Sequence, residues 1–109
     1  MVRRSAGPGD VLAEELRTLG VTPTELARQI AVPPNRISQI IHGKRAITGD
    51  TALRLAHWFG TDPRFWMDLQ AQHEVRVAQE QAGDEIESLP TRIGLRAAEK
   101  VKTSTKGGR

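Results

Sequence analysis

Residues 32–48 carry side chains of a kind and spacing that suit contact with a nucleic acid. The polar positions at i, i+3, i+4 and i+7 share one face of a helix and have no fixed charge at neutral pH: Asn35, Ser38, Gln39 and His42. The apolar positions form the opposite stripe, which a helix buries against a core: Ile37, Ile40 and Ile41. Solvated helix faces are usually rich in Lys and Glu, so a face of short uncharged groups indicates that these side chains bind a ligand.

This face has the chemistry to read DNA bases. An Asn or Gln amide pairs with the edge of adenine, an Arg guanidinium with guanine, and a Ser hydroxyl with either. The expected base-reading residues are Asn35, Arg36, Ser38, Gln39 and His42. The expected phosphate-contacting residues carry hydroxyl or basic groups: Thr22, Thr24, Arg28, Lys44 and Arg45. The alternative is an all-helical domain whose polar face has no ligand.

Start and stop signals predict five helices, and no strand, in the first 82 residues. The first helix starts near residues 8–10 and stops at Gly20, the second opens at Thr22, the third runs from about Pro34 to His42, the fourth lies between Thr48 and Gly60, and the fifth starts at Pro63. Thr22 and Glu25 have the spacing of a capping box, in which each side chain bonds the other's backbone.

Apolar periodicity predicts which side chains these helices bury. The expected inward residues are Leu12, Leu16 and Leu19 in the first helix, Leu26, Ala27 and Ile30 in the second, Ala52, Leu53, Ala56 and Phe59 in the fourth, and Phe65, Trp66 and Leu69 in the fifth. The second and third helices, joined by a short turn, have the arrangement of a helix-turn-helix. Small Ala27 allows them to approach, and the outer face of the third helix then fits the DNA major groove.

Composition limits the class of protein. A chain of 109 residues, 38% hydrophobic, suits one small helical domain. The absence of cysteine excludes disulfides, thiolate metal sites and Cys nucleophiles. The net charge of +3 divides unevenly, because residues 92–109 hold six basic residues against Glu99, which leaves 3 − 5 = −2 for residues 1–91. Residues 22–45 nevertheless carry a local +3, which would steer a polyanion to that side.

The chain is expected to divide into a helix-turn-helix DNA-binding domain, residues 1–82, and a flexible basic tail, residues 83–109. The tail mixes charges with Pro and Gly, and its few apolar residues cannot form a core. A helix over residues 93–101 is an alternative for part of it. The sequence has no apolar run that suits a signal peptide or a membrane span, so we expect a cytoplasmic protein.

Neither an enzyme nor a metal site is expected. His42, His57 and His73 lack the spacing and carboxylate neighbours of metal ligands, so we expect no catalytic residue, no cofactor and no small-molecule substrate. The aromatic residues are expected to lie in the core: Trp58, Phe59, Phe65 and Trp66. Two of them, Trp58 and Trp66, are alternatively candidates for a dimer or partner contact.

Taken in order, the motifs of residues 8–79 resemble the HigA/VapI family of addiction-module antitoxins, a branch of the lambda-repressor-like helix-turn-helix proteins. "PGDVLAEEL" is similar to the family's entry helix, "ELARQIAV" and "RISQIIHGKRAIT" to its helix-turn-helix, and "ALRLAHWFGTDPRFWMDLQ" to its closing signature. Two departures stand out. Ala31 occupies a turn position where the family usually has Gly, and Pro33 and Pro34 occupy the place of the usual cap of the third helix.

The resemblance implies a homodimer that represses its own operon and neutralises a HigB toxin, a RelE-like mRNA endonuclease. Acidic residues of the first helix suit a basic toxin: Asp10, Glu14 and Glu15. We expect the folded part to bind the toxin and the tail to be dispensable. The dimer seam is expected in the late helix, with His73 and Val77 one turn apart. A stand-alone repressor without a toxin and an interaction domain that no longer binds DNA are the rivals.

Overall fold

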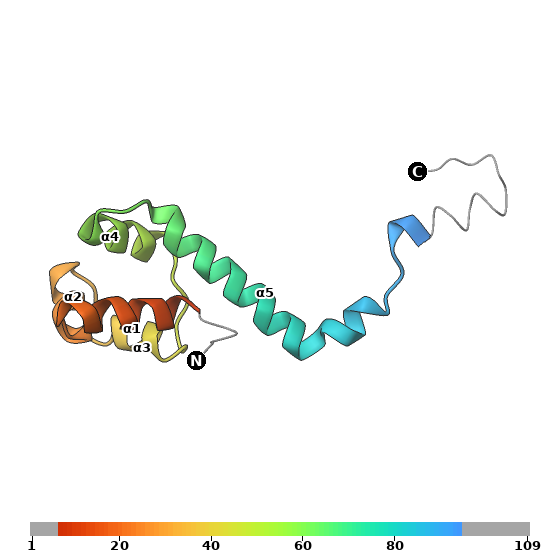
Figure 1. Ribbon diagram of the computed structural model, residues 1–109, viewed down its shortest axis with the longest axis horizontal. Coiled ribbons are helices and arrows are strands. Elements are labelled where there is room, and N and C mark those ends of the chain that lie inside the picture. The colour runs from red at the N-terminus through yellow and green to blue at the C-terminus, as the bar shows by residue number, and fades with distance from the viewer. Residues whose placement is uncertain (1–6, 95–109) are drawn as a thin grey trace. The chain divides into compact units, whose positions relative to one another are not determined.

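The computed structural model describes residues 7–94, and within that range its regular structure is entirely helical (Figure 1). The helices are α1 (Pro8–Leu19), α2 (Pro23–Gln29), α3 (Arg36–Ile41), α4 (Gly49–Phe59) and α5 (Pro63–Glu87). Two compact units are distinguished, Met1–Val77 and Ala78–Arg109, and the first unit contains α1 to α4 and the start of α5. The predicted all-α fold with five helices is therefore confirmed.

Helix α1 begins and ends where the sequence predicts. The Gly7 amide donates to Asp10 Oδ2 at 3.1 Å, and Gly20 ends the helix in the left-handed conformation at φ 70°. Gly9 permits a close crossing, because a Cβ atom there would lie 2.4 Å from the carbonyl oxygen of Ile40. The start of α1 is thus packed directly against the end of α3.

Helix α2 has half of the predicted capping box. Thr22 Oγ1 accepts a hydrogen bond from the Glu25 amide at 3.1 Å. The Glu25 carboxylate does not return to the Thr22 amide; it accepts instead from Arg28 Nε at 3.2 Å and Gln29 Nε2 at 2.7 Å. The prediction of a reciprocal box was wrong because a guanidinium and an amide one turn along the helix bind the carboxylate instead.

The turn between α2 and α3 contains Ala31 at φ 59°, the one described residue other than glycine with a positive φ. A Cβ atom in this conformation costs about 1–2 kcal/mol. Two hydrogen bonds to neighbouring carbonyls offset part of this cost: Arg54 Nη1 donates to the carbonyl of Ile30 at 2.9 Å and to that of Ala31 at 3.5 Å. Helix α4 therefore stabilises the strained turn through Arg54.

Helix α3 starts two residues later than predicted. Pro34 was expected in its first turn, but the backbone forms a separate turn there, in which the Arg36 amide donates to the Pro33 carbonyl at 2.9 Å. The first α-helical bond runs from the Gln39 amide to the Asn35 carbonyl at 3.0 Å. The turn closed by the Arg36–Pro33 bond therefore takes the place of a first helical turn at Pro34. His42 likewise lies outside, as the residue that follows Ile41 at the helix end.

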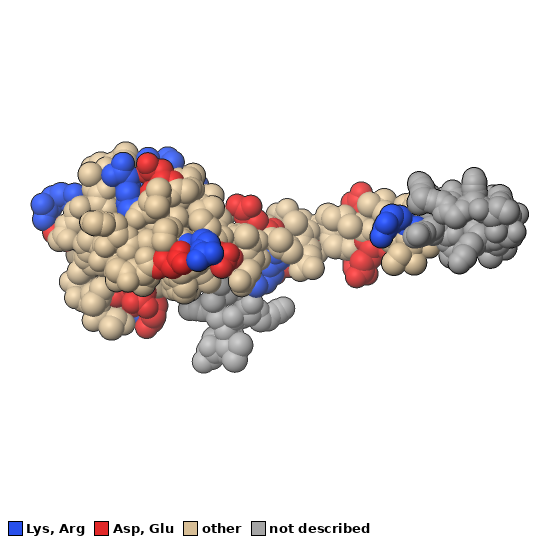
Figure 2. Space-filling model, turned by 90° about the horizontal axis from the view of Figure 1, so that it is seen from above, with Lys and Arg blue, Asp and Glu red and all other residues tan. Residues whose placement is uncertain are grey.

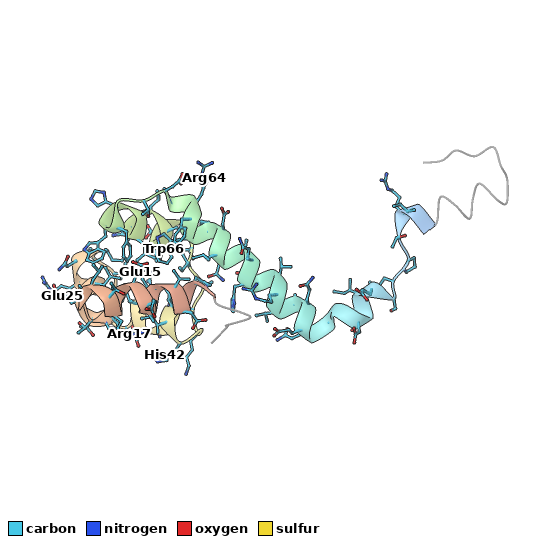
Figure 3. The ribbon with its side chains drawn as sticks, viewed as in Figure 1. Glu15, Arg17, Glu25, His42, Arg64 and Trp66 are labelled. Atoms are coloured by element: carbon cyan, nitrogen blue, oxygen red, sulfur yellow. The ribbon has the colours of Figure 1, made fainter. Side chains whose placement is uncertain are left out.

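The core of the first unit lies between α1, the α2–α3 pair, α4 and the start of α5. Its fully buried apolar residues are Leu12, Leu16, Leu26, Ala27, Ile30, Ile37, Ile40, Ile47, Ala52, Leu55, Ala56 and Trp66. Figure 3 shows Trp66 pointing from α5 into the space between α4 and α1. Its ring centroid lies 5.5 Å from that of Phe59. The predicted crossing of α2 and α3, with Ala27 at the contact, agrees with this core.

Three residues predicted to point inward are exposed: Leu19 by 53%, Leu53 by 62% and Phe65 by 47%. In α4 the buried stripe runs through Ala52, Leu55 and Ala56, at i, i+3 and i+4, so Leu53 falls outside it. Leu19 lies in the last turn of α1 and Phe65 in the first turn of α5. Phe65 covers only the edge of Trp66, with ring centroids 5.1 Å apart. Apolar character and approximate helical spacing predicted that these three residues point inward, but neither shows which part of a helix the neighbouring helices cover.

Helix α5 continues through Gly83 to Glu87, past the position where a change of character was expected. Leu69, which was predicted to point inward, is half-buried in the first part of α5. The predicted division into residues 1–82 and 83–109 remains a prediction. Most of the alternative helix over residues 93–101 lies outside the described residues, which end at Gly94.

Candidate nucleic-acid interface

The polar face of α3 is available to a ligand at three positions. Ile37 and Ile40 are buried, so the opposite side of this short helix is turned outward. Asn35 is exposed and Ser38 half-buried, and among the described residues neither side chain makes a hydrogen bond within the protein. His42 is exposed as well, and Figure 3 shows its ring pointing outward at the end of α3. These groups are free to bond an external partner.

The His42 ring has one nitrogen engaged. Nδ1 lies 2.8 Å from the Ser38 carbonyl, which can only accept, so Nδ1 carries the hydrogen of the neutral ring. Nε2 is then the acceptor. The neutral His42 side chain therefore offers a hydrogen-bond acceptor at this surface, which suits an amino group on a base edge.

Gln39 is joined to the loop that follows α3. Arg45 Nε donates to Gln39 Oε1 at 2.9 Å, so the two predicted contact residues act as one pair. The Gln39 amide nitrogen remains as a donor. The expectation that Gln39 reads bases and Arg45 contacts phosphate remains a prediction, and helical spacing gave no sign of the bond between them.

Arg36 is the least accessible of the predicted base-reading residues. Its side chain is half-buried, and its Nε atom is buried without a hydrogen-bond partner among the described residues. The guanidinium therefore runs along the protein surface rather than standing free. Its terminal nitrogens are the part that remains able to reach a base or a phosphate.

The predicted phosphate-contacting residues differ in whether their side chains already have a partner within the protein. Lys44 is exposed, and its ammonium group has no partner among the described residues. Thr24 is exposed, whereas the Thr22 hydroxyl caps α2. Arg28 is paired with Glu25, and hydrogen bonds from Arg28 and then Gln29 lower the pKa of the Glu25 carboxyl below its ordinary value. Lys44 is thus a free cation, and Arg28 is partly neutralised.

The acidic residues of α1 are all exposed, but their surroundings differ. The Asp10 carboxylate accepts from the Gly7 amide, and the Glu14 carboxylate is 2.8 Å from the Arg17 guanidinium. Glu15, labelled in Figure 3, makes no hydrogen bond or ion pair with another described residue. The three carboxylates follow one another on a single helix, as predicted, with Glu15 the freest.

Away from the polar face of α3 and the acidic residues of α1, charges of both signs are mixed on the surface of the first unit. The side seen in Figure 2 carries acidic and basic side chains interspersed, with no continuous patch of one sign. Ion pairs between residues close in sequence also occur in this unit: Arg54 lies 2.7 Å from Asp50, and Arg64 lies 2.9 Å from Asp62. Opposite charges at these distances cancel at long range, so this side offers little attraction to a polyanion.

Neither a metal site nor a membrane span is found in the part of the chain that the structure describes. No three His, Cys, Asp or Glu residues converge there, and no described helix is long and apolar enough to cross a bilayer. His73, a candidate for the dimer seam, lies close to Gly7 of the same chain, since a Cβ atom on Gly7 would lie 2.7 Å from His73 Nδ1. The dimer seam remains a prediction. Val77 is half-buried.

Sequence reasoning missed three polar residues that fix this surface from a distance. Arg54 bonds the carbonyls of the α2–α3 turn, and Trp58 Nε1 donates to Gln29 Oε1 at 2.7 Å. Gln70, only 7% exposed, accepts from the Ile47 amide at 2.8 Å. Each pairing joins residues 23 to 29 positions apart, so helical spacing carries no sign of it.

Comparison with known proteins places this geometry in a family. The helix-turn-helix family model (HTH_3) matches residues 12–66, the range from α1 to Trp66. Virulence-associated protein I of Dichelobacter nodosus is 39% identical over 74 residues, which are 67% of this chain and 68% of that protein.

Solved structures of the same fold are more specific. An addiction module antidote protein of a HigA family from Coxiella burnetii is 44% identical, with a TM-score of 0.78, over 82% of this chain and 98% of that one. The antitoxin HigA of Pseudomonas aeruginosa, solved with the higBA promoter, is 32% identical with a TM-score of 0.78 and the same coverage. The chain belongs to the HigA family of helix-turn-helix antitoxins.

Proposed function

We propose that this protein is an antitoxin that binds operator DNA in its own promoter as a homodimer and neutralises a HigB-like toxin. The observation that carries the DNA part is the outward polar face of α3 beside the unpaired Lys44. A relative of this fold, 32% identical, is the Pseudomonas aeruginosa antitoxin solved with promoter DNA. Repression follows if the bound dimer occludes the promoter.

In this proposal the face of α3 enters the major groove. Asn35, Ser38 and His42 contact base edges with the free groups described above, and the Gln39–Arg45 pair contacts them as a unit. Because Arg45 engages the Gln39 carbonyl oxygen, the pair presents mainly donors, which favours guanine over the adenine expected from Gln39 alone. Arg36 contributes through its terminal nitrogens.

Phosphate contacts in this proposal anchor the helix on the DNA backbone. Lys44 supplies the strongest anchor because no carboxylate among the described residues neutralises it. Thr22 and Thr24 at the start of α2 add hydroxyl contacts, and Arg28 contributes less while Glu25 binds it. A homodimer would place two copies of α3 about 34 Å apart, so the operator should be an inverted repeat.

The toxin is proposed to bind the acidic surface of α1 made by Asp10, Glu14 and Glu15. A HigB-like ribonuclease that binds mRNA is expected to be basic, and complementary charge speeds and orients such an association. The tail is basic, which argues against it as the main toxin contact. Deleting residues 84–109 should therefore leave protection from the toxin intact; lost protection with DNA binding retained would assign neutralisation to the tail.

Two experiments test the proposal as a whole. A fragment of the native promoter should be retarded on a gel by this protein, and Lys44→Ala should weaken binding and reduce the dependence of log K on log salt by about 0.9 for each protomer of the dimer. The product of the adjacent gene should co-purify with this protein. Retardation without such a partner would favour a stand-alone repressor, and a partner without retardation would favour a pure interaction domain.

A further inference from the structure

The loop after α3 carries Lys44, a proposed phosphate contact, and Arg45, which bonds Gln39. Its two ends are fixed by different means. At the first end the Gly43 amide donates to the Ile40 carbonyl at 3.1 Å and the Lys44 amide to the Gln39 carbonyl at 2.8 Å. Both bonds belong to the end of α3. Lys44, Arg45 and the following Ala46 are exposed, so packing does not determine their path.

The second end of the loop is fixed by a side chain from α5. The Ile47 amide donates to Gln70 Oε1 at 2.8 Å, a buried hydrogen bond across 23 residues. Ile47 is 1% exposed, so its amide lies away from bulk solvent. An unpaired amide at this depth would carry its full desolvation cost, which makes the bond a strong constraint on the local backbone.

The orientation of the Gln70 amide is itself set by a second bond. Gln70 Nε2 donates to Glu74 Oε2 at 2.9 Å, one turn further along α5. A carboxylate can only accept, so it selects the amide nitrogen and turns the oxygen toward Ile47. Glu74, Gln70 and the Ile47 backbone thus form a chain of hydrogen bonds that ends directly beside the loop.

We propose that Gln70 is a positioning residue for DNA binding: its amide, oriented by Glu74, fixes the backbone at Ile47 and thereby holds Lys44 and Arg45 beside α3. This rests on the proposed function, because it assigns those two residues to DNA. Arg45 can pair with Gln39 only while the loop keeps this path. Helix α5 therefore contributes to DNA affinity without touching DNA.

Removing the acceptor tests this role. Gln70→Leu has a similar volume and no acceptor, so operator and random DNA should both bind about tenfold more weakly, and the salt slope should fall by about 1–2 for each protomer of the dimer as the loop cations are lost. Leu16→Val is the matched control, because Leu16 is a core residue of α1, 2% exposed, with no bond to the loop. It should lower thermal stability yet leave the salt slope unchanged.

A swap of the two polar groups provides a rescue. In the double variant Gln70→Glu, Glu74→Gln, the carboxylate at 70 still accepts from the Ile47 amide and also accepts from the new amide at 74. Its DNA affinity and salt slope should return to within about threefold of wild type, whereas Gln70→Glu alone, which places two carboxylates together, should not recover. An unchanged salt slope in Gln70→Leu would overturn the proposal and leave Gln70 a merely structural residue.

A measurement without DNA separates this inference from the proposed function. Amide order parameters of residues 44–47 in the full chain, about 0.85 in a rigid backbone, should fall toward about 0.6 in Gln70→Leu and stay high in Leu16→Val and in the swap variant. If the loop loosens in this way but wild-type protein binds no DNA, the proposed function fails and Gln70 keeps only its role in fixing the loop. If the loop stays rigid in Gln70→Leu, the positioning role is refuted whatever the DNA result.

Discussion

The exposed face of α3 and the exposed face of α1 lie on the same folded unit and carry opposite chemistry. The face of α3 presents short neutral groups, with the free ammonium of Lys44 just beyond it. The face of α1 presents carboxylates, of which Glu15 has no partner among the described residues. A polyanion is attracted to the first and repelled by the second, so the two surfaces can serve DNA and a basic protein separately.

The largest effect is expected from reversing charge on α1. Glu14→Lys with Glu15→Lys should weaken toxin binding by about 2–4 kcal/mol, because like charges then face each other across the interface. Operator affinity should be unchanged or slightly raised. Isothermal titration with the co-purified toxin measures the toxin affinity, and a gel shift measures the operator affinity. The same charge change at Glu80 and Glu85 is the control. Equal weakening of toxin binding by the two pairs of substitutions would show that α1 is not the specific toxin contact.

A smaller effect, confined to operator DNA, is expected on α3. Gln39→Ala removes one base contact and frees Arg45, so operator affinity should fall by about 1–3 kcal/mol while random DNA loses little. Fluorescence anisotropy with operator and with random DNA gives the ratio of the two affinities. Toxin binding should not change. Equal losses on operator and random DNA would show that this face does not read sequence.

Relieving the strained turn should change the stability of the protein, but not its binding to DNA or to the toxin. Ala31→Gly removes the Cβ atom from a left-handed position, and after the entropy gained by the unfolded chain the net stabilisation should be about 0.5–1 kcal/mol. The melting temperature should then rise by about 3–6 °C in circular dichroism. Ala46→Gly, at a loop position without positive φ, should give no such rise. A lower melting temperature for Ala31→Gly would mean that the turn is not strained.

The smallest effect concerns Arg28. Glu25 binds this guanidinium and has a lowered pKa as a result, so Arg28 is partly neutralised at neutral pH. Glu25→Gln should release it and increase the salt slope of DNA binding by up to about 0.9 for each protomer of the dimer, with little sequence preference. Acidification below the lowered pKa should mimic the substitution in wild type. A salt slope that stays constant in Glu25→Gln would place Arg28 away from the phosphates.

Much of the fold was predictable because its signals are local. Gly20 and Gly60 end helices in the left-handed conformation, Thr22 and Thr48 cap them, and periodic apolar residues fill the core. Errors arose where local signals compete or end. Leu53 is apolar but lies off the buried stripe, and Pro34 could begin a helix only if no tighter turn formed before it.

The candidate site was predictable only in part, because sequence spacing identifies a face and not its internal bonds. The polar side of α3 follows from helical periodicity. The Gln39–Arg45 pair depends on the path of a loop, and Gln70 reaches Ile47 from another helix across 23 residues. "FWMDLQ" contains Gln70, but its apolar residues suggested only packing. Long-range polar contacts of this kind need the fold before they can be seen.

The absence of cysteine allows the most direct test of the central claim that α3 enters DNA while α1 does not. A single cysteine placed by His42→Cys, and another by Glu15→Cys, can each carry an iron chelate that cleaves nearby DNA. The account predicts that the probe at 42 cuts the promoter at two symmetric positions about one helical turn apart, and that the probe at 15 cuts weakly or not at all. Strong cleavage from position 15, or none from position 42 on bound promoter, would contradict it.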